Sequence, residues 1–194
     1  MTSQDLKTAC EQLGHSAFVV PLSQQFPKRA DEMGAQLVIC DLKDDFSGLR
    51  AAKDAIRWFK LPAIVVSDTN DDIVTRKVAA TKVSGCLFQP VASEGLRLTI
   101  VMAMTRHYRE TERLAQGILM GQARLTEDES YRLLQEDASK TGRTLYDQAN
   151  LVIEEAEDRA RRRENELEEP WNGTKRAADR SGRGQTDSRT SGKS

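Results

Sequence analysis

Apolar residues follow two different patterns along the first part of the chain. Four short runs, at residues 17–20, 37–40, 63–66 and 86–88, are almost entirely apolar, as is typical of strands buried on both faces. Residues 3–13, 22–33, 48–60 and 71–81 instead carry apolar side chains at helical spacing, and Met33, Ile73 and Ala79 are among those expected to face the sheet. This alternation predicts a parallel sheet covered by helices on both sides.

A continuous helical pattern follows at residues 93–122, and two further amphipathic helices come after it. Thr126 and Glu129 form a capping-box signature at the start of the first of these two. Either Thr141 or Thr144 can cap the other. Short helices with small residues at their contacts predict a compact three-helix bundle. The residues expected in its core are Leu114, Ala115, Ile118, Leu119, Tyr131, Leu134, Ala138, Leu145, Ala149, Val152 and Ala156.

The long helix also carries a repeat at alternating steps of three and four residues, as in the contact seam of a coiled coil. We interpret this repeat as the seam of a parallel homodimer. The alternative is a helix that packs on its own domain. The residues of this predicted seam are Val101, Met104, Tyr108, Thr111, Ala115 and Ile118.

One segment of the bundle reads Ala115-Gln116-Gly117-Ile118-Leu119-Met120, and Leu134, Ala138, Arg143, Leu145, Ala149 and Val152 follow it. This A-x-G-[IL]-L-M opening and the later spacing resemble the ANTAR domain, a family of RNA-binding antitermination modules at the C-termini of bacterial response regulators. Many members carry Lys at the position of Gln116 and Ala at that of Ser130. The resemblance implies a bundle that binds a pair of stem-loops in a nascent leader transcript and so prevents a terminator hairpin.

Proteins read unpaired RNA bases through hydrogen bonds and stacking, and they hold phosphates with basic side chains. The candidate RNA-binding residues are therefore polar, basic or small. Lys140 and Arg143 flank the turn between the second and third helices, where free amides at a helix start add to the attraction for phosphate. The full set is Arg113, Gln116, Gly117, Arg124, Lys140, Arg143 and Thr144.

Polar residues directly follow three of the predicted strands, namely Asp41, Ser67 and Gln89. The carboxyl ends of parallel strands form the usual functional edge of such a sheet. Asp41 and Ser67 resemble the phosphoryl-accepting Asp and the hydroxyl residue of the receiver domain of response regulators. Gln89 stands where that family has Lys and cannot supply a cation to a phosphoryl group, and the family's acidic pair for magnesium has no counterpart. We interpret Asp41 as a relic phosphoacceptor in a degenerate receiver-like domain.

The acidic pair is missing together with the first strand of the receiver topology. That strand would lie between the strands expected at 17–20 and 37–40. Either these two strands pair directly, or an N-terminal segment precedes this sequence.

Composition and charge narrow the functional classes. The formal net charge is −1, so any nucleic-acid contact must come from a local basic cluster. Three widely spaced cysteines in apolar contexts predict buried, reduced thiols. No signal peptide or membrane span is visible, which predicts a soluble cytoplasmic protein. A Gly-rich phosphate loop, paired metal ligands and a nucleophile motif are also missing from the sequence, so we expect neither an enzyme nor a metal or other cofactor.

These patterns predict four segments: a degenerate receiver-like domain (1–92), a coiled-coil linker helix (93–111), an ANTAR three-helix domain (112–169) and a disordered tail without an apolar pattern (170–194). The leading hypothesis is an RNA-binding transcription antiterminator controlled through the receiver-like domain. Two alternatives stay open. One is a protein-interaction module whose receiver-like domain binds a sensor or repressor partner; the other is a phosphorylation-controlled response regulator of a two-component system.

Overall fold

The computed structural model describes residues 2–23, 25–42 and 45–168; the predicted tail lies outside these ranges. Three strands, β1 (Val38–Asp41), β2 (Ala63–Ser67) and β3 (Gly85–Phe88), form a parallel sheet in the order β1-β2-β3. All five residues of the central strand β2 are buried, as expected for a strand covered on both faces. The predicted parallel α/β sheet is confirmed.

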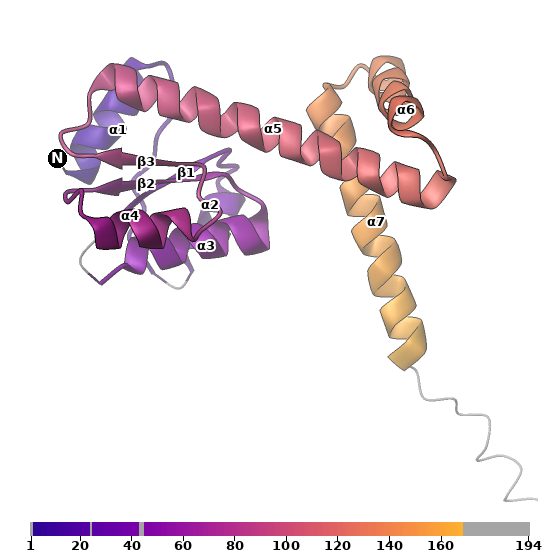
Figure 1. The fold of residues 1–194 in the computed structure, drawn as a ribbon, viewed down its shortest axis with the longest axis horizontal. Helices are drawn as coiled ribbons and strands as arrows, with labels where there is room; N and C mark the ends of the chain where they lie inside the picture. The colour runs from indigo at the N-terminus through magenta and orange to yellow at the C-terminus, as the bar shows by residue number, and fades with distance from the viewer. Residues whose placement is uncertain (1, 24, 43–44, 169–194) are drawn as a thin grey trace, which may run out of the picture.

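Helices cover both faces of this sheet (Figure 1). On one face lie α2 (Phe26–Glu32), α3 (Ser47–Phe59) and α4 (Asp72–Ala79), whose apolar side chains pack around Val65. On the other face lie α1 (Ser3–Gln12) and the first part of α5 (Ser93–Ala123), which pack around Ile64. A Cβ on Gly48 would lie 1.8 Å from the Asp41 carbonyl oxygen, so glycine lets α3 approach β1 closely.

The prediction of a strand at residues 17–20 is wrong. These residues follow an irregular path, and β1 pairs with β2 alone, so the two segments do not pair directly as strands. Ala17 and Val20 pack against opposite faces of the core, while Phe18 and Val19 are exposed. An apolar run forms a strand only where a neighbour completes the hydrogen-bond ladder, and residues 17–20 have no such neighbour within the described chain.

Three side chains expected to face the sheet are exposed instead. Met33 and Ile73 belong to the exposed large apolar residues, and Ala79 is exposed as well. In α4, only Val74 and Val78 are buried. These two positions are one helical turn apart, so the helix contacts the sheet along a narrow stripe and the flanking residues point away from it.

The long helix α5 continues into a bundle with α6 (Glu127–Thr141) and α7 (Leu145–Glu168). The predicted capping box of α6 is present, because Thr126 accepts from the Glu129 amide and Glu129 accepts from the Thr126 amide. Thr144 caps α7 by accepting from the Asp147 amide at 3.1 Å. The bundle core consists of Ala115, Leu134 and Ala149, with Leu119, Leu145, Val152 and Ile153 packed around them.

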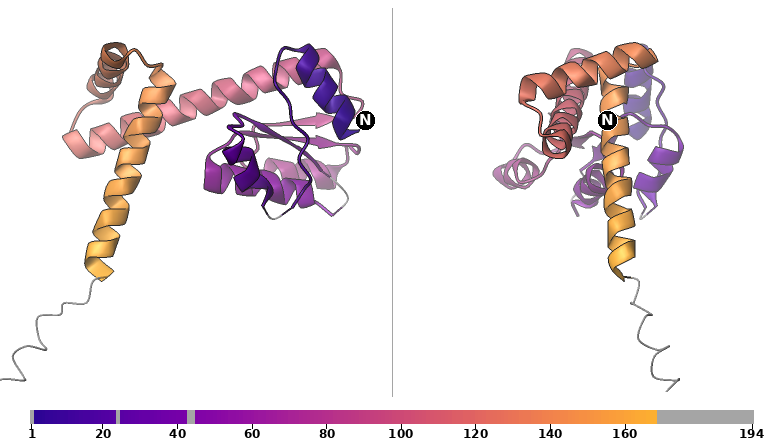
Figure 2. Two further views of the ribbon diagram at one scale, coloured as in Figure 1. Left: turned by 180° about the vertical axis from the view of Figure 1, so that it is seen from behind. Right: turned by 90° about the vertical axis from the view of Figure 1, so that its right-hand side faces the viewer.

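Helix α7 crosses α5 and then extends beyond the bundle (Figure 2). At the crossing, the Tyr108 and Tyr146 rings pack in a tilted arrangement with their centroids 4.5 Å apart, and His107 Nε2 lies 2.9 Å from the Tyr146 hydroxyl. Farther along α7, Glu157 forms an ion pair with Lys60 of the sheet domain at 3.5 Å. A cleft of about 640 Å³ lies between the two parts of the chain at this place. None of the described helices is both long and apolar enough to cross a membrane.

Candidate nucleic-acid interface

The seam predicted for a parallel dimer is largely covered by the chain itself. Tyr108 packs on Tyr146 of α7, and Thr111 and Ala115 are buried. Met104 packs into the core between the sheet and α5. Steps of three and four residues fit any helix-to-helix contact, and here they fit an internal one. These four positions therefore pack within the chain, whereas Val101 is exposed, and the dimer contact itself stays a prediction.

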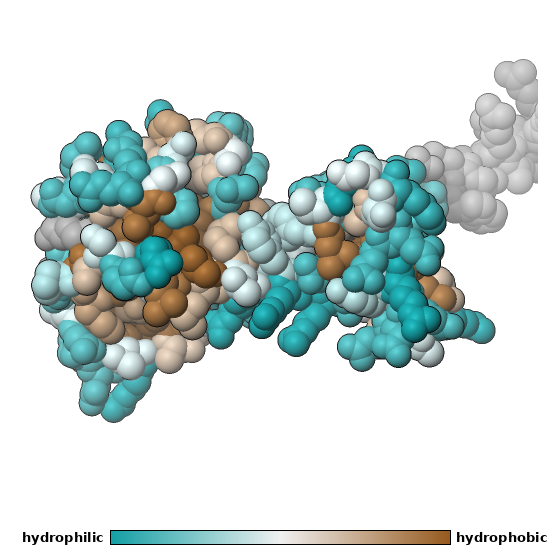
Figure 3. All heavy atoms as spheres, turned by 90° about the horizontal axis from the view of Figure 1, so that it is seen from above, coloured by the Kyte–Doolittle hydropathy of each residue, from teal (hydrophilic) through white to brown (hydrophobic). Residues whose placement is uncertain are grey.

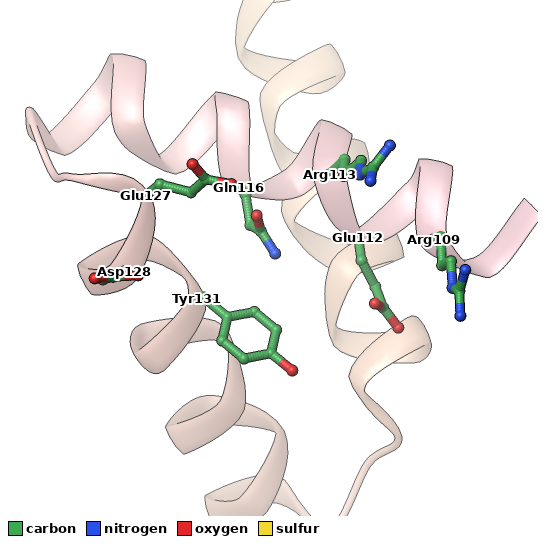
Figure 4. A pocket seen from close by; sticks show the side chains of 7 residues that line it. All are labelled: Arg109, Glu112, Arg113, Gln116, Glu127, Asp128 and Tyr131. Carbon is green, nitrogen blue, oxygen red and sulfur yellow. The ribbon is translucent and has the colours of Figure 1, made fainter. Parts of the chain in front are cut away.

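A groove of about 310 Å³ runs between α5 and α6 and contains two of the predicted RNA-binding residues, Arg113 and Gln116. Arg109 lies one turn of α5 before the neighbouring residues Glu112 and Arg113, and the Arg113 side chain extends away from Tyr131 (Figure 4). The first turn of α6 contributes two acidic residues, and Tyr131 follows one turn later with its ring directed across the groove. The seven lining residues are Arg109, Glu112, Arg113, Gln116, Glu127, Asp128 and Tyr131.

The polar groups of this groove are not used within the fold. Across the described chain, none of the seven lining side chains forms a hydrogen bond or an ion pair with another residue. Elsewhere the helices pair their charges, as in Lys140 with Glu136 and Arg159 with Glu155. Hydrogen-bonding groups that the fold leaves unpaired can bind a polar ligand without breaking internal contacts.

The predicted RNA-binding residues at the turn between α6 and α7 differ in whether their side chains are already bonded within the chain. Lys140 is held by Glu136 at 3.5 Å and Asp137 at 3.7 Å. The Thr144 hydroxyl caps α7, where it hydrogen-bonds to the side chain and the backbone amide of Asp147. Arg143 is exposed, and its side chain forms no ion pair or hydrogen bond with any described residue. Of the three, Arg143 is the side chain most available to a ligand.

This turn and the groove lie at opposite ends of α6. A 15-residue helix places its ends roughly 22 Å apart, so the predicted residues form two separate clusters rather than one site. Gly117 lies beside Gln116, and a Cβ added to it would meet no atom within 4 Å, so the α5 backbone is open to a ligand there. Arg124 is exposed and ends α5 in the left-handed conformation at φ 55°.

At the sheet edge, the strand register brings together the residues that the sequence compared with a receiver site. Asp41 pairs with Val66, the residue before Ser67, and the Gln89 amide donates to the Ser67 carbonyl at 2.8 Å. Ser67 is buried, and its hydroxyl is bonded to the backbone of Thr69. Within the described ranges, no group of three or more His, Cys, Asp or Glu side chains could hold a metal ion.

Burial shifts the pKa values of one histidine and of the cysteines. Burial lowers the pKa of His107 below its ordinary value, and the charge of Glu110 partly opposes this shift. The three cysteines are free, with Cys10 and Cys40 buried and Cys86 partly buried. Burial raises the pKa of the Cys40 thiol to about 12, so this thiol stays protonated at neutral pH.

A parallel sheet domain is joined by one long helix to a helical bundle, and each part resembles a different class of known protein. Residues 107–153, which include most of the bundle, match the ANTAR domain family. No curated protein matches the sequence.

One solved structure supports the fold of the sheet domain. The signal receiver domain of a modulated diguanylate cyclase from Desulfovibrio desulfuricans G20 is 21% identical, with a TM-score of 0.50 over 56% of this chain and 88% of that one. The receiver domain of a LuxO repressor protein from Vibrio parahaemolyticus is 19% identical, with a TM-score of 0.47 over the same shares. At this identity the first similarity shows the receiver fold alone.

Two groove residues, Arg109 and Tyr131, were not among the residues predicted from the sequence to bind RNA. Arg109 lies before the segment that resembles the ANTAR opening. Tyr131 was placed in the bundle core because its spacing to Leu134 and Ala138 fits the apolar stripe of α6. The spacing of a stripe does not distinguish its centre from its edge, and Tyr131 lies at the edge with 38% of its surface exposed.

Proposed function

We propose that this protein is an RNA-binding transcription antiterminator that acts in the cytoplasm without catalytic activity of its own. The observation that carries this proposal is the match of residues 107–153 to the ANTAR domain. In this proposal the bundle binds stem-loops of a nascent leader mRNA and stabilises them against the terminator hairpin. RNA binding that depends on a few local contacts is consistent with a net charge near zero.

The proposed contacts divide between the two clusters of the bundle. In the groove, Arg113 provides charge and Gln116 provides an amide that can hydrogen-bond to a base edge. Gly117 lets the RNA approach the α5 backbone closely. At the far end of α6, Arg143 binds phosphate, and Lys140 and Thr144 contribute less because both are engaged within the fold. Arg124 adds charge where α5 ends.

We assign homodimerisation to an exposed side of α5 that includes Val101 of the expected seam. Leu98, Val101 and Met102 are 55%, 52% and 61% exposed and recur at steps of three and one, so they lie on one side of the helix. Apolar atoms are exposed over the sheet domain, whereas polar residues cover most of the bundle (Figure 3). A second copy that covers this stripe would remove apolar surface from water on both chains.

Control is proposed to pass through a degenerate receiver-like domain. Gln89 offers no cation beside Asp41, so phosphorylation of Asp41 is not the expected signal. The exposed apolar surface of the sheet domain favours a second candidate function. In it, a sensor or repressor protein binds the receiver-like domain, and the bundle serves as an interaction module.

An RNA mobility-shift assay with Arg143→Ala tests the leading proposal. The full-length protein should bind a leader RNA with two hairpins, and the substitution should weaken binding by roughly 1–3 kcal/mol, as expected for a charge-assisted contact. The thermal stability should not change, because Arg143 is exposed and has no partner in the described chain.

Arg132→Ala is the matched control, since it removes the same charge from an exposed position in the middle of α6. If both variants lose affinity equally, the effect is one of overall charge and Arg143 is not a specific contact. If the wild-type protein does not shift any two-hairpin RNA, the antiterminator proposal is refuted and the interaction module takes its place.

A further inference from the structure

We propose that Tyr131 is a stacking platform for one unpaired RNA base in the groove between α5 and α6. Gln116 would hydrogen-bond to the edge of that base, and Arg109 and Arg113 would hold the adjoining phosphate. This inference rests on the proposed RNA-binding function and adds to it a defined subsite for a single splayed-out base.

The position of Tyr131 gives the first argument. Leu134 and Ala138 fill the bundle core from α6, so the core does not require an aromatic ring at residue 131. The ring keeps 38% of its surface exposed and extends from α6 into the groove, where the Gln116 side chain approaches it from α5 (Figure 4). Exposed aromatic faces beside amide groups are the usual platform on which proteins stack and read unpaired bases.

The second argument is that the groove consists of hydrogen-bonding groups with no use inside the chain. The Gln116 amide, the Tyr131 hydroxyl and the Glu112 carboxylate have no hydrogen-bond or ion-pair partner among the described residues. An amide offers both donors and an acceptor, and a carboxylate accepts from amino groups, so together they match the mixed edge of a base. A purely cationic ligand would have no use for the guanidinium groups of the same groove.

The distribution of charge gives the third argument. Glu127 and Asp128 lie at one end of the groove, whereas Arg109 and Arg113 lie along α5 toward the other end, where Glu112 offsets only one of their two positive charges (Figure 4). A phosphate is repelled at the acidic end and attracted at the arginine end. The uncharged base can occupy the middle, over Tyr131, while its phosphate lies on the arginine side. Because three acids line the groove with two arginines, a duplex backbone without an unpaired base gains little there.

Fluorescence of a base analogue tests this subsite in the full-length protein. A pool of two-hairpin RNAs with randomised loops is first selected for binding to the wild-type protein. Each loop position of a selected RNA is then replaced in turn by 2-aminopurine, whose fluorescence changes when it stacks on an aromatic ring. The proteins compared are the wild type, Tyr131→Phe, which keeps the ring, and Tyr131→Leu, which keeps apolar bulk but has no aromatic face.

We expect one loop position to be quenched by the wild-type protein and by Tyr131→Phe but not by Tyr131→Leu. The affinity of Tyr131→Leu should fall about tenfold, the loss typical of one base–aromatic stack. Circular dichroism should show the same helix content for all three proteins. Gln116→Ala should weaken binding while it leaves the quench at that position in place, because it removes the edge contact and not the ring.

The possible failures are distinguishable. If the wild-type protein retains no RNA from the pool, the proposed RNA-binding function is refuted and the stacking subsite with it. If the wild type binds but Tyr131→Leu binds equally well with the same quench, only the stacking role of Tyr131 is overturned. If Tyr131→Leu loses affinity without any position-specific change in quench, its effect is structural and the inference is again overturned.

Discussion

Two leucines of the helical bundle, Leu134 and Leu114, provide a sharp test of its packing. The sequence places both in the apolar stripes that form the core. In the structure, Leu134 is 1% exposed and lies at the centre of the core, whereas Leu114 is 53% exposed on α5. The same substitution, Leu to Ala, should therefore have very different consequences at these two positions of one small domain.

The expected cost at Leu134 follows from its surroundings. Replacing a buried leucine by alanine costs about 3–5 kcal/mol where the surroundings cannot collapse into the cavity. The residues that face Leu134 across the core, Ala115 and Ala149, are alanines whose side chains cannot extend to fill the space. A domain of this length has a free energy of unfolding of roughly 2–7 kcal/mol, so Leu134→Ala should remove most of it. Leu114→Ala should change it by less than about 0.5 kcal/mol, since the site is exposed and alanine favours a helix.

Thermal melts followed by circular dichroism at 222 nm measure the helix content of both variants. Leu134→Ala should lose part of its helical signal at a lower temperature than the wild type, and hydrogen exchange should show that the early loss lies in α6 and α7. Leu114→Ala should melt like the wild type. Equal destabilisation by the two substitutions would show that Leu114 is also packed inside the domain, and the described arrangement of α5 against α6 would then be wrong.

Three further predictions concern the phosphoacceptor, the dimer and pH. Acetyl phosphate with magnesium should leave the intact mass of the protein unchanged, because Asp41 has no cation from Gln89 beside it; a gain of one phosphoryl group that Asp41→Asn abolishes would contradict this. Met102→Asp should convert a dimer to a monomer in sedimentation velocity at micromolar concentration, and a monomeric wild type would exclude the α5 stripe as the dimer contact. Because burial lowers the pKa of His107, the unfolded chain binds its proton more readily, so the free energy of unfolding should fall as the pH drops below about 6.5. His107→Gln should reduce this pH dependence of the free energy of unfolding. If the variant keeps the wild-type pH profile, other groups cause the dependence.

Local signals in the sequence were sufficient wherever the structure depends on neighbouring residues. The capping box of Thr126 and Glu129 was predicted correctly, because its hydrogen bonds join residues three positions apart. The parallel sheet follows from apolar runs separated by helical segments, and its three strands begin and end within a residue or two of those runs. The residues that resemble the ANTAR opening fall inside the matched range of 107–153.

Signals that depend on distant partners were ambiguous in the sequence. The repeat that includes Tyr108 and Ala115 specifies a helix contact but not the identity of the partner, which in the structure is α7 of the same chain. The apolar run at residues 17–20 was misassigned because a strand requires a neighbour that periodicity does not reveal. Tyr131 was assigned to the core for a related reason. Its three-residue spacing to Leu134 fits a buried residue at the centre of the apolar stripe and a partly exposed residue at its edge equally well.

The same internal contacts provide a route by which the receiver-like domain can influence the proposed RNA binding. Helix α5 runs without a break from Leu96, which is buried against the sheet, to Gln116 in the groove. It therefore joins the two parts of the chain as one rigid element. A second connection runs through α7, which contacts α5 at Tyr146 and the sheet domain through Glu157 and Lys60. An exposed ion pair of this kind contributes little to stability, so it can open at small cost when a partner binds the sheet domain. Helix α7 supplies Ala149 to the bundle core, and Leu134 of α6 packs in the same core. A shift of α7 on α5 would therefore move α6 and change the groove that α6 forms with α5.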